Sequence, residues 1–221
     1  MKPSAFIPYD YDPLAPEESL IKAQLFFEET DKRRSVRHYS NTPVDEEVIK
    51  NIIKTASSAP SGAHKQPWTF CAISNPALKK EIRIAAEKEE YTNYHGRMGD
   101  EWLKDLEKFE TDWKKPFLEE APWLIIVFKK VHDIENGEKK KNYYVNESVG
   151  IASGFLISAI HQAGLVTLTH TPSPMNFLEK ILERPKNERA FLLLPVGYPE
   201  ADVKVPKLKR KSLEEMAVFY K

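Results

Sequence analysis

The segment from residue 123 to residue 169 decides the fold class of this 221-residue chain. It begins with the apolar run WLIIVF (123–128), which predicts a buried strand, and it ends with LVTLT (165–169), which predicts another. Between them lies NESVGIASGFLISAIHQ (146–162), an apolar stretch long enough for a helix. Two strands that enclose a helix indicate a layered fold that contains a sheet.

Outward from this segment, helical and strand patterns mix without a strict alternation. Apolar spacing and capping residues predict helices at 19–29, after Asp45, from Pro76 to about 90, at 101–114 and at 176–182, and strands at 68–73 and 189–196. This order favours an α+β fold with a mixed β-sheet flanked by helices over a doubly wound fold. Within the helix at 146–162, a set of small residues predicts burial at a close helix contact: Gly150, Ala152, Ser153, Gly154 and Ala159.

Composition and charge exclude several classes of protein. Lys plus Arg and Asp plus Glu are balanced at 33 each, so no global field favours nucleic acid or an anionic membrane. The longest apolar runs, 121–128 and 150–160, are shorter than the roughly 18 residues of a membrane span. One cysteine, Cys71, and six histidines without ligand spacing predict no metal site. We expect a cytoplasmic protein, with Cys71 a buried, unreactive residue.

The two ends of the chain differ from its middle. The first 16 residues, within an arm expected at about 1–18, are rich in Pro and Tyr, and residues 199–221 begin by alternating Lys with Val, Leu and Pro. These patterns predict extended arms on a single domain that spans residues 1–221. Asn136-Gly137 predicts a turn, and the adjoining run Lys139–Lys141 is interpreted as a solvated loop rather than a binding patch.

Three polar segments could carry chemistry. RRSVR (33–37) offers guanidinium forks that suit a phosphate, PSGAH (60–64) offers a hydroxyl and backbone N–H groups, and TLTHTP (167–172) offers hydroxyls at a strand end. Each also has an ordinary explanation. These are a solvated basic turn, a simple connector, and threonines chosen for β propensity.

Together these segments resemble the flavin-dependent nitroreductase superfamily, and most closely its iodotyrosine deiodinase branch. The resemblance extends over roughly residues 25–215 and rests on RRSVR (33–37), APSGAH (59–64), PWTF (67–70), NY (93–94), RMG (97–99), AGLVT (163–167), LPVGYP (194–199) and LKRK (208–211). It implies a nitroreductase-like fold and a homodimer whose protomers exchange arms.

The resemblance also implies the cofactor site. It assigns FMN to a set of residues from distant segments: Arg33, Arg34, Ser35, Arg37, Ser61, Thr169, His170, Thr171 and Arg210. Thr171 matches the catalytic hydroxyl that donates to flavin N5, whereas His170 stands where the family usually has Thr.

The resemblance further implies a substrate site made by Ala63, Glu90, Tyr94 and Lys115. Glu90 and Tyr94 are four residues apart and share a helix face if the helix continues through them. A halotyrosine is a zwitterion, so Glu90 would accept from its ammonium and Lys115 would pair with its carboxylate. Ala63 would give its backbone N–H to the phenolate. On spacing alone, scattered charges on a solvated helix remain the alternative.

The implied activity is FMN-dependent reductive dehalogenation of iodo-, bromo- or chlorotyrosine, which releases halide and tyrosine. Residues 91–115 would close over the substrate as a lid. NAD(P)H would be the ultimate reductant, directly or through a separate flavin reductase. The rival hypotheses are a broad NAD(P)H-dependent nitro or quinone reductase and a non-enzymatic protein that binds flavin or an amino acid.

Overall fold

The computed structural model describes residues 6–221, so the first five residues of the expected N-terminal arm lie outside the described residues. The chain forms two compact units, residues 1–33 and 34–221. The first unit contains α1 (Pro16–Asp31), which begins three residues earlier than expected because Pro16 suits the first position of a helix. None of its residues is buried, and it exposes Leu20, Ile21, Leu25, Phe26 and Phe27.

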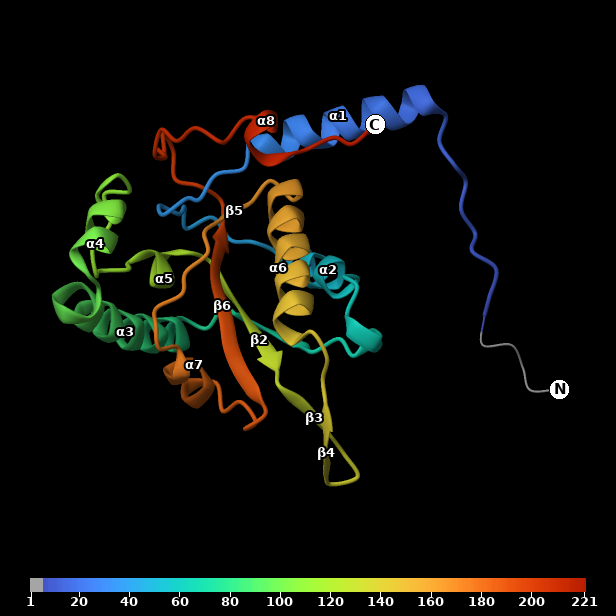
Figure 1. Cartoon of the computed structure of the whole chain (residues 1–221). Helices are drawn as coiled ribbons and strands as arrows, with labels where there is room; N and C mark the ends of the chain where they lie inside the picture. Colours follow the sequence, from blue (N-terminus) through green and yellow to red (C-terminus); the bar gives the residue numbers. More distant parts are fainter. Residues whose placement is uncertain (1–5) are drawn as a thin grey trace. The chain divides into compact units, whose positions relative to one another are not determined.

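The second unit is built on a four-stranded sheet with the order β1-β2-β6-β5 (Figure 1). The strands are β1 (Trp68–Ile73), β2 (Trp123–Lys130), β5 (Val166–Thr167) and β6 (Glu188–Gly197). Their three ladders are antiparallel, and an isolated bridge pairs Ser35 with Thr167 in parallel. The predicted α+β class is therefore confirmed, and the bridge holds the RRSVR segment against the sheet edge.

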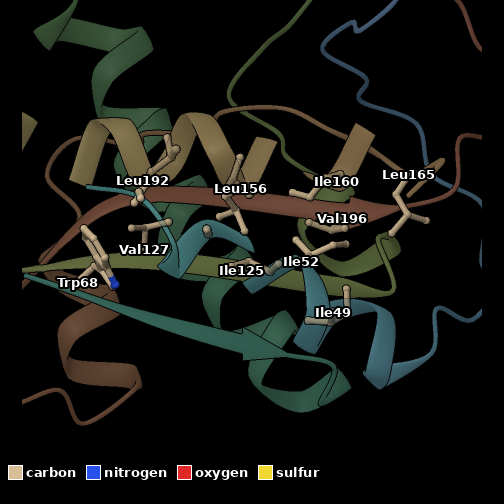
Figure 2. Close-up of a cluster of buried hydrophobic side chains, with 14 of the residues drawn as sticks. Ile49, Ile52, Trp68, Ile125, Val127, Leu156, Ile160, Leu165, Leu192 and Val196 are labelled. Atoms are coloured by element: carbon tan, nitrogen blue, oxygen red, sulfur yellow. The ribbon is translucent and has the colours of Figure 1, made fainter. Parts of the chain in front are cut away.

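Helices cover both faces of the sheet. On one face α2 (Glu46–Ser57) and α6 (Val145–Gln162) pack on β2 and β6, and Figure 2 shows Ile52, Ile125, Leu156 and Val196 in this cluster. On the other face lie α3 (Pro76–Thr92), α5 (Phe117–Glu120) and α7 (Asn176–Ile181). The continuous apolar run of β2 follows from this arrangement, because successive side chains enter opposite layers.

Two helix starts form as their capping residues predict. Asp45 accepts a hydrogen bond from the backbone N–H of Glu47 at 2.7 Å, and α2 begins directly after it. Asn75 accepts from the N–H groups of Ala77 and Leu78 at 2.9 and 3.1 Å, with Pro76 at the first helical position. The second cap fixes the direction of α3, whose far end carries Glu90.

The region expected to be a lid is less helical than its sequence predicts. A π-turn, η2 (Asn93–Arg97), follows α3, and α4 (Asp100–Glu107) ends seven residues before the expected helix end at 114. Glu110 has a left-handed φ of 47°, and Asp112 accepts from the N–H of Lys114 at 2.7 Å. Such an aspartate turn competes with helix, so residues 108–115 return to the domain as a loop.

Lys139–Lys141 are exposed, as expected, but they form a strand and not a loop. These lysines lie in β4 (Glu138–Lys141), which pairs with β3 (His132–Glu135) in a separate hairpin. Asn136 and Gly137 have φ values of 53° and 81°, the paired left-handed conformation of a tight two-residue hairpin turn. The lysines are exposed, but the strand fixes the direction in which each one points.

Two further expectations need correction. Gly150 and Gly154 lie on an exposed side of α6, and no atom would meet a side chain added at either position. Ala152 and Ser153 are buried, as predicted, together with Ser148, Val149, Leu156 and Ile160. The strand predicted at 165–169 is reduced to Val166–Thr167, although His170 makes an isolated bridge with Leu193.

The C-terminal stretch has little regular structure. Residues 203–212 contain no helix or strand, and a short helix, α8 (Leu213–Met216), follows with Ser212 and Glu215 capping each other's backbone N–H groups. Within residues 6–221, no helix has both the length and the apolarity that a bilayer crossing requires.

Candidate active site

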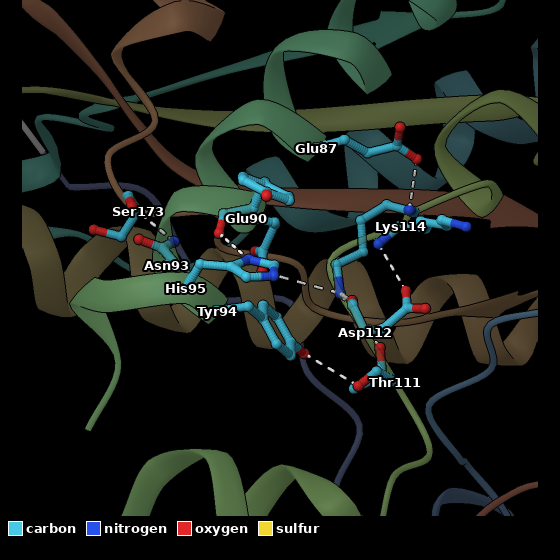
Figure 3. Close-up of polar contacts among 11 residues, drawn as sticks. Glu87, Glu90, Asn93, Tyr94, His95, Thr111, Asp112, Lys114 and Ser173 are labelled. Carbon is cyan, nitrogen blue, oxygen red and sulfur yellow. Dashed lines mark hydrogen bonds and ion pairs between the residues drawn. The ribbon is translucent and has the colours of Figure 1, made fainter. Parts of the chain in front are cut away.

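The end of α3 and the loop before α5 bring Glu90, Tyr94 and Lys115 together. The Nζ atom of Lys115 lies 4.0 Å from Oε2 of Glu90 and 5.3 Å from the centre of the Tyr94 ring. Tyr94 donates through its hydroxyl to the carbonyl of Thr111 at 3.3 Å (Figure 3). The expected grouping of these three side chains is therefore present within one chain.

Both charged members of this group are buried. Glu90 is 6% exposed and Lys115 is 4% exposed. Burial raises the pKa of Glu90, an effect that Lys115 opposes, and burial lowers the pKa of Lys115, an effect that Glu90 opposes. Their separation is at the outer limit of an ion pair, so neither charge is fully compensated. Such a pair is suited to a zwitterion that supplies one opposite charge to each partner.

Neighbouring groups hold this pair in place. Lys115 donates to Oγ1 of Thr111 at 3.3 Å and to the carbonyl of Asp112, and its backbone N–H donates to Oε1 of Glu87 at 2.7 Å. Sequence reasoning missed Glu87, although it lies one turn before Glu90 on the same helix face. It also missed Asn93, a buried side chain that donates to the carbonyl of Ser173 at 3.0 Å (Figure 3).

Arg37 adds a second cation beside this group. Its guanidinium lies 5.6 Å from the centre of the Phe109 ring, and its charge helps burial to lower the pKa values of Lys115 and His170. Burial raises the pKa of Tyr94, an effect that the charge of Arg37 opposes. Arg37, Ser35 and Phe109 line a cavity of about 620 Å³ whose other wall is formed by residues 200–207. This volume is within the range of small-molecule sites. The lining carries both signs of charge, with the cations Arg37, Lys108, Lys204 and Lys207 and the carboxylates Glu110, Glu200 and Asp202.

The other arginines of the predicted cofactor site lie in different parts of the chain. Arg34 donates to the carbonyl of Pro206, which ties the C-terminal stretch to the start of the second unit. Arg210 is exposed in the segment before α8. Arg33 is the last residue of the first unit, and its backbone N–H donates to the carbonyl of Thr30 at 3.1 Å.

The side chains of Thr169-His170-Thr171 alternate between exposed and buried positions. Both threonines are exposed, whereas His170 is buried and packs edge-on against Phe117 with ring centres 5.5 Å apart. Burial, together with the charges of Lys115 and Arg37, lowers the pKa of His170 to about 3. The imidazole is therefore neutral at ordinary pH, and its Nε2 has no hydrogen-bond partner among the described residues.

The turn that carries Ser61 and Ala63 is η1 (Gly62–His64). Oγ of Ser61 accepts from the N–H of Gln66 at 2.9 Å, and the N–H of Gly62 donates to Oγ of Ser148 at 3.3 Å. A Cβ atom on Gly62 would lie only 2.9 Å from the Tyr143 carbonyl oxygen, so this position requires glycine. Ala63 is exposed with a left-handed φ of 51°.

Ser61 and Ala63 are not part of the group around Glu90. Their turn follows α2 and contacts α6, on one face of the sheet, whereas Glu90 and Lys115 belong to the layer of α3 and α5 on the other face. The predicted site residues of one chain therefore form two separate groups.

Cys71 lies on β1 and is half-buried, where full burial was expected. Burial raises its pKa, which keeps the thiol protonated and unreactive. Among residues 6–221, no three His, Cys, Asp or Glu side chains gather in a way that could hold a metal ion.

The residues present fit FMN. Arg34 and Arg37 supply guanidinium groups of the kind that bind phosphate, and the cavity beside Arg37 is large enough for a cofactor. The exposed hydroxyls of Thr169 and Thr171 and the exposed backbone at Ala63 offer hydrogen bonds for a polar ring system.

Comparison with known proteins supports the same conclusion. The model of the nitroreductase family matches residues 30–198, which is more than half of the chain. The chain therefore belongs to the nitroreductase family. Its fold and the cavity beside Arg37 are consistent with that class.

The most similar relatives define the branch of this family. The chain is 60% identical to an iodotyrosine deiodinase of Haliscomenobacter hydrossis over 217 residues, which is 98% of each protein. It is 47% identical to iodotyrosine deiodinase 1 of Homo sapiens over 96% of this chain and 74% of the human protein. A crystal structure of oxidized iodotyrosine deiodinase bound to FMN and 3-iodo-L-tyrosine matches with a TM-score of 0.75 at 32% identity, over 88% of this chain and 100% of that one. The chain thus belongs to the iodotyrosine deiodinase branch.

Proposed function

We propose that this protein is an FMN-dependent reductive dehalogenase that converts halotyrosines to tyrosine and halide. The buried Glu90 and Lys115, 4.0 Å apart beside Tyr94, carry the proposal, because a simple nitroreductase substrate has no zwitterion to use them. The similarity to a structure that holds FMN and 3-iodotyrosine supports the same substrate class.

In this function, Glu90 accepts hydrogen bonds from the substrate ammonium and Lys115 pairs with the substrate carboxylate. Tyr94, whose hydroxyl already points to the Thr111 carbonyl, adds a further hydrogen bond. The N–H of Ala63 binds the phenolate oxygen. These contacts orient the ring, and burial strengthens them by excluding water.

Bound FMN supplies two electrons, which together with one proton replace the carbon–halogen bond by a carbon–hydrogen bond and release halide. Arg33, Arg34, Ser35, Arg37, Ser61 and Arg210 hold the cofactor, with Thr169, His170 and Thr171 along its ring. Thr171 is the proposed donor to flavin N5. Because His170 is buried and neutral while its neighbours are exposed, its role is to support the position of the two threonines.

We further propose that a homodimer completes the site. Within one chain, the Ser61 turn and the Glu90 group belong to opposite layers, so a second protomer must supply one of them. The exposed face of α6 contains Gly150, Ile151, Gly154 and Phe155, which suits a close helix contact with a partner. Exposed apolar residues, among them Ile7 and Tyr9 near the N-terminus and Val218 and Phe219 near the C-terminus, suit arms at about 1–18 and 199–221 that exchange between protomers.

The lid belongs to this proposal. Tyr94, near the start of residues 91–115, and Lys115, at their end, both lie in the site. A ligand that pairs with Glu90 and Lys115 therefore holds both ends of this segment against the site. NAD(P)H remains the proposed ultimate reductant, directly or through a separate flavin reductase. A cytoplasmic location is proposed, and the single cysteine is compatible with its reducing conditions.

A comparison of two substrates tests the function against its main rival. The FMN-loaded protein should release iodide from 3-iodotyrosine under dithionite, and it should prefer this substrate to a nitroaromatic compound at equal concentration. Nitroaromatic reduction without iodide release would instead support a broad nitroreductase. Bound flavin with neither activity would support a binding protein.

A further inference from the structure

The β3–β4 hairpin separates its charges between its two sides. Directly opposed residues share a side in an antiparallel pair, so Lys139 lies beside Ile134 and Lys141 beside His132. The other side carries Asp133, Glu135, Lys140 and Glu138, where Lys140 pairs with Glu138 at 3.3 Å and Lys65 pairs with Glu135 at 3.8 Å. All of the hairpin's carboxylates are therefore on the second side.

The first side, which we call the lysine face, consists of His132, Ile134, Lys139, Lys141 and the adjoining Tyr143. Ile134 is 61% exposed and Tyr143 is 47% exposed, while both lysines are also exposed. Lys141 lies 6.0 Å from the centre of the Tyr143 ring. The hairpin does not need exposed apolar side chains beside lysines in order to fold. This combination is typical of weak protein–protein contacts that are guided by charge.

The lysine face is connected to the proposed flavin site. Tyr143 follows the hairpin directly, and its carbonyl oxygen occupies the space that a side chain on Gly62 would need. Gly62 lies between Ser61 and Ala63, the two turn residues proposed to contact flavin and substrate. A protein docked on the lysine face would therefore lie next to the turn that touches the cofactor.

We propose that the lysine face docks an acidic electron-transfer protein that reduces the flavin. This inference rests on the proposed function, which consumes two electrons for each halide released. The hairpin projects from the sheet, as Figure 1 shows, and small molecules favour concave sites, so the face fits a protein better than a nucleotide. The lysine face is positively charged although the whole chain has no net charge. This local positive charge favours an acidic partner.

The electron transfer balances with a one-electron donor of the [2Fe–2S] ferredoxin class. Two reduced ferredoxins are each oxidised by one electron, and the two electrons with one proton reduce the bound FMN. The reduced cofactor then passes both electrons and this proton to the halotyrosine, so one halotyrosine consumes two reduced ferredoxins and one proton.

 With free halide as the product, one halotyrosine, two reduced ferredoxins and one proton give tyrosine, one halide ion and two oxidised ferredoxins.

The test uses an acidic plant-type ferredoxin that has been reduced beforehand. It is mixed anaerobically with the FMN-loaded protein in a stopped-flow instrument, and the rate of FMN reduction is measured. Lys139→Glu/Lys141→Glu should slow this reaction about tenfold or more at low salt, and it should weaken the dependence of the rate on salt. The matched control is Lys54→Glu/Lys80→Glu, which changes the net charge equally on exposed positions of α2 and α3 and should keep the wild-type rate within about twofold.

Three outcomes would overturn the proposal. The lysine-face variant could accept electrons at the wild-type rate, the control variant could be slowed equally, or NAD(P)H alone could reduce the flavin with the same sensitivity to Lys139 and Lys141. FMN content and reoxidation of the dithionite-reduced variant by 3-iodotyrosine should both match the wild type, which shows that the site is intact. If even the wild type fails to react with 3-iodotyrosine, the proposed function fails, but the ferredoxin rates still decide whether this face docks a donor.

Discussion

Glu90 and Lys115 are the residues on which substrate choice depends. Each is almost fully buried, and each has only partial compensation from the other at 4.0 Å. A buried charge without a good partner is costly, so a ligand that brings an ammonium and a carboxylate gains binding free energy from both. A phenol without these groups gains neither.

We therefore expect Glu90→Gln and Lys115→Ala each to raise the Kd for 3-iodotyrosine by about thirtyfold or more, because removal of one partner from a buried charge pair costs roughly 2 to 5 kcal/mol. Binding can be followed through the flavin spectrum. The Kd for 2-iodophenol should hardly change, and Lys114→Ala, at the exposed neighbouring lysine, is the matched control. Equal weakening of both ligands would mean that these residues act on the fold or on the flavin.

His170 should make the protein sensitive to acid. Its pKa is about 3 in the folded protein and near 6.5 when unfolded, so between these values the unfolded chain binds more protons. Stability should then fall as the pH falls from about 6.5 towards 3. The effect exists because a neutral imidazole is buried beside Lys115 and Arg37, whose positive charges also oppose its protonation.

Between pH 7 and pH 5, wild-type protein should lose about 2 kcal/mol more unfolding free energy than His170→Thr, measured by urea denaturation with FMN in excess. His64→Asn changes an exposed histidine with a left-handed φ of 54°, a conformation that asparagine tolerates, and its pH profile should match that of the wild type. Parallel pH profiles for wild type and His170→Thr would show that the imidazole is solvated in solution.

At the scale of elements, residues 91–115 are held by side chains more than by regular structure. Arg97 pairs with Glu89 at 2.8 Å, and the ring of Tyr91 meets that of Trp113 edge-on with centres 5.3 Å apart. The middle of the segment, α4, has no buried residue. The ends of the segment are thus fixed to α3, while its centre can move away from the domain at a small cost in free energy.

This arrangement predicts that a ligand closes the segment. Limited digestion with trypsin should cut the FMN-loaded protein at Lys104 or Lys108, which are exposed, and saturation with 3-iodotyrosine should slow that cleavage about tenfold or more. Iodophenol at saturation should protect less because it cannot join Glu90 to Lys115. Equal protection by both ligands, or cleavage elsewhere first, would contradict a lid closed by the zwitterion.

The elements differ in how well the sequence predicts them. The starts of α2 and α3 follow from Asp45 and Asn75, because a cap and the apolar spacing after it are local properties of the chain. The end of α4 was mispredicted, because it depends on Glu110, a left-handed residue that the helical pattern around it conceals. The turn at Asn136-Gly137 could be predicted, because this pair favours left-handed conformations, but the strands on either side were missed, since their mostly charged residues show no strand pattern.

The candidate site shows the same division. Glu90 and Tyr94 could be placed together from their spacing on a helix, but the approach of Lys115 depends on a loop whose return no local pattern determines. The burial of His170 results from packing against Phe117, which is 53 residues earlier in the chain. Contacts of this kind arise from tertiary structure, and a motif can indicate only that the residue is present.

At the scale of the whole molecule, the proposed homodimer explains why one chain keeps its site residues in two layers. Ile151 and Phe155 are exposed on α6 next to glycines that leave room for a partner. If this face joins two protomers, the Ser61 turn of one can meet the Glu90 group of the other. Dimerisation and cofactor binding should then be linked.

Phe155→Glu should therefore yield a monomer by light scattering, with FMN affinity reduced about tenfold or more, because a charge in an apolar interface costs several kcal/mol. Ile84→Glu changes an exposed residue on α3 and should leave both properties unchanged. Circular dichroism should show that both variants keep their secondary structure. A Phe155→Glu monomer that binds FMN with full affinity would mean that one chain completes its own cofactor site.

The central claim is that this protein uses reduced FMN to remove halogen from a halotyrosine, and an anaerobic single turnover tests it most directly. The FMN-loaded protein is reduced with dithionite and mixed with one equivalent of 3-iodotyrosine, and the flavin spectrum, iodide and tyrosine are measured. The account predicts reoxidation of the flavin with one iodide and one tyrosine formed for each flavin. A flavin that stays reduced, with no iodide released, would contradict it.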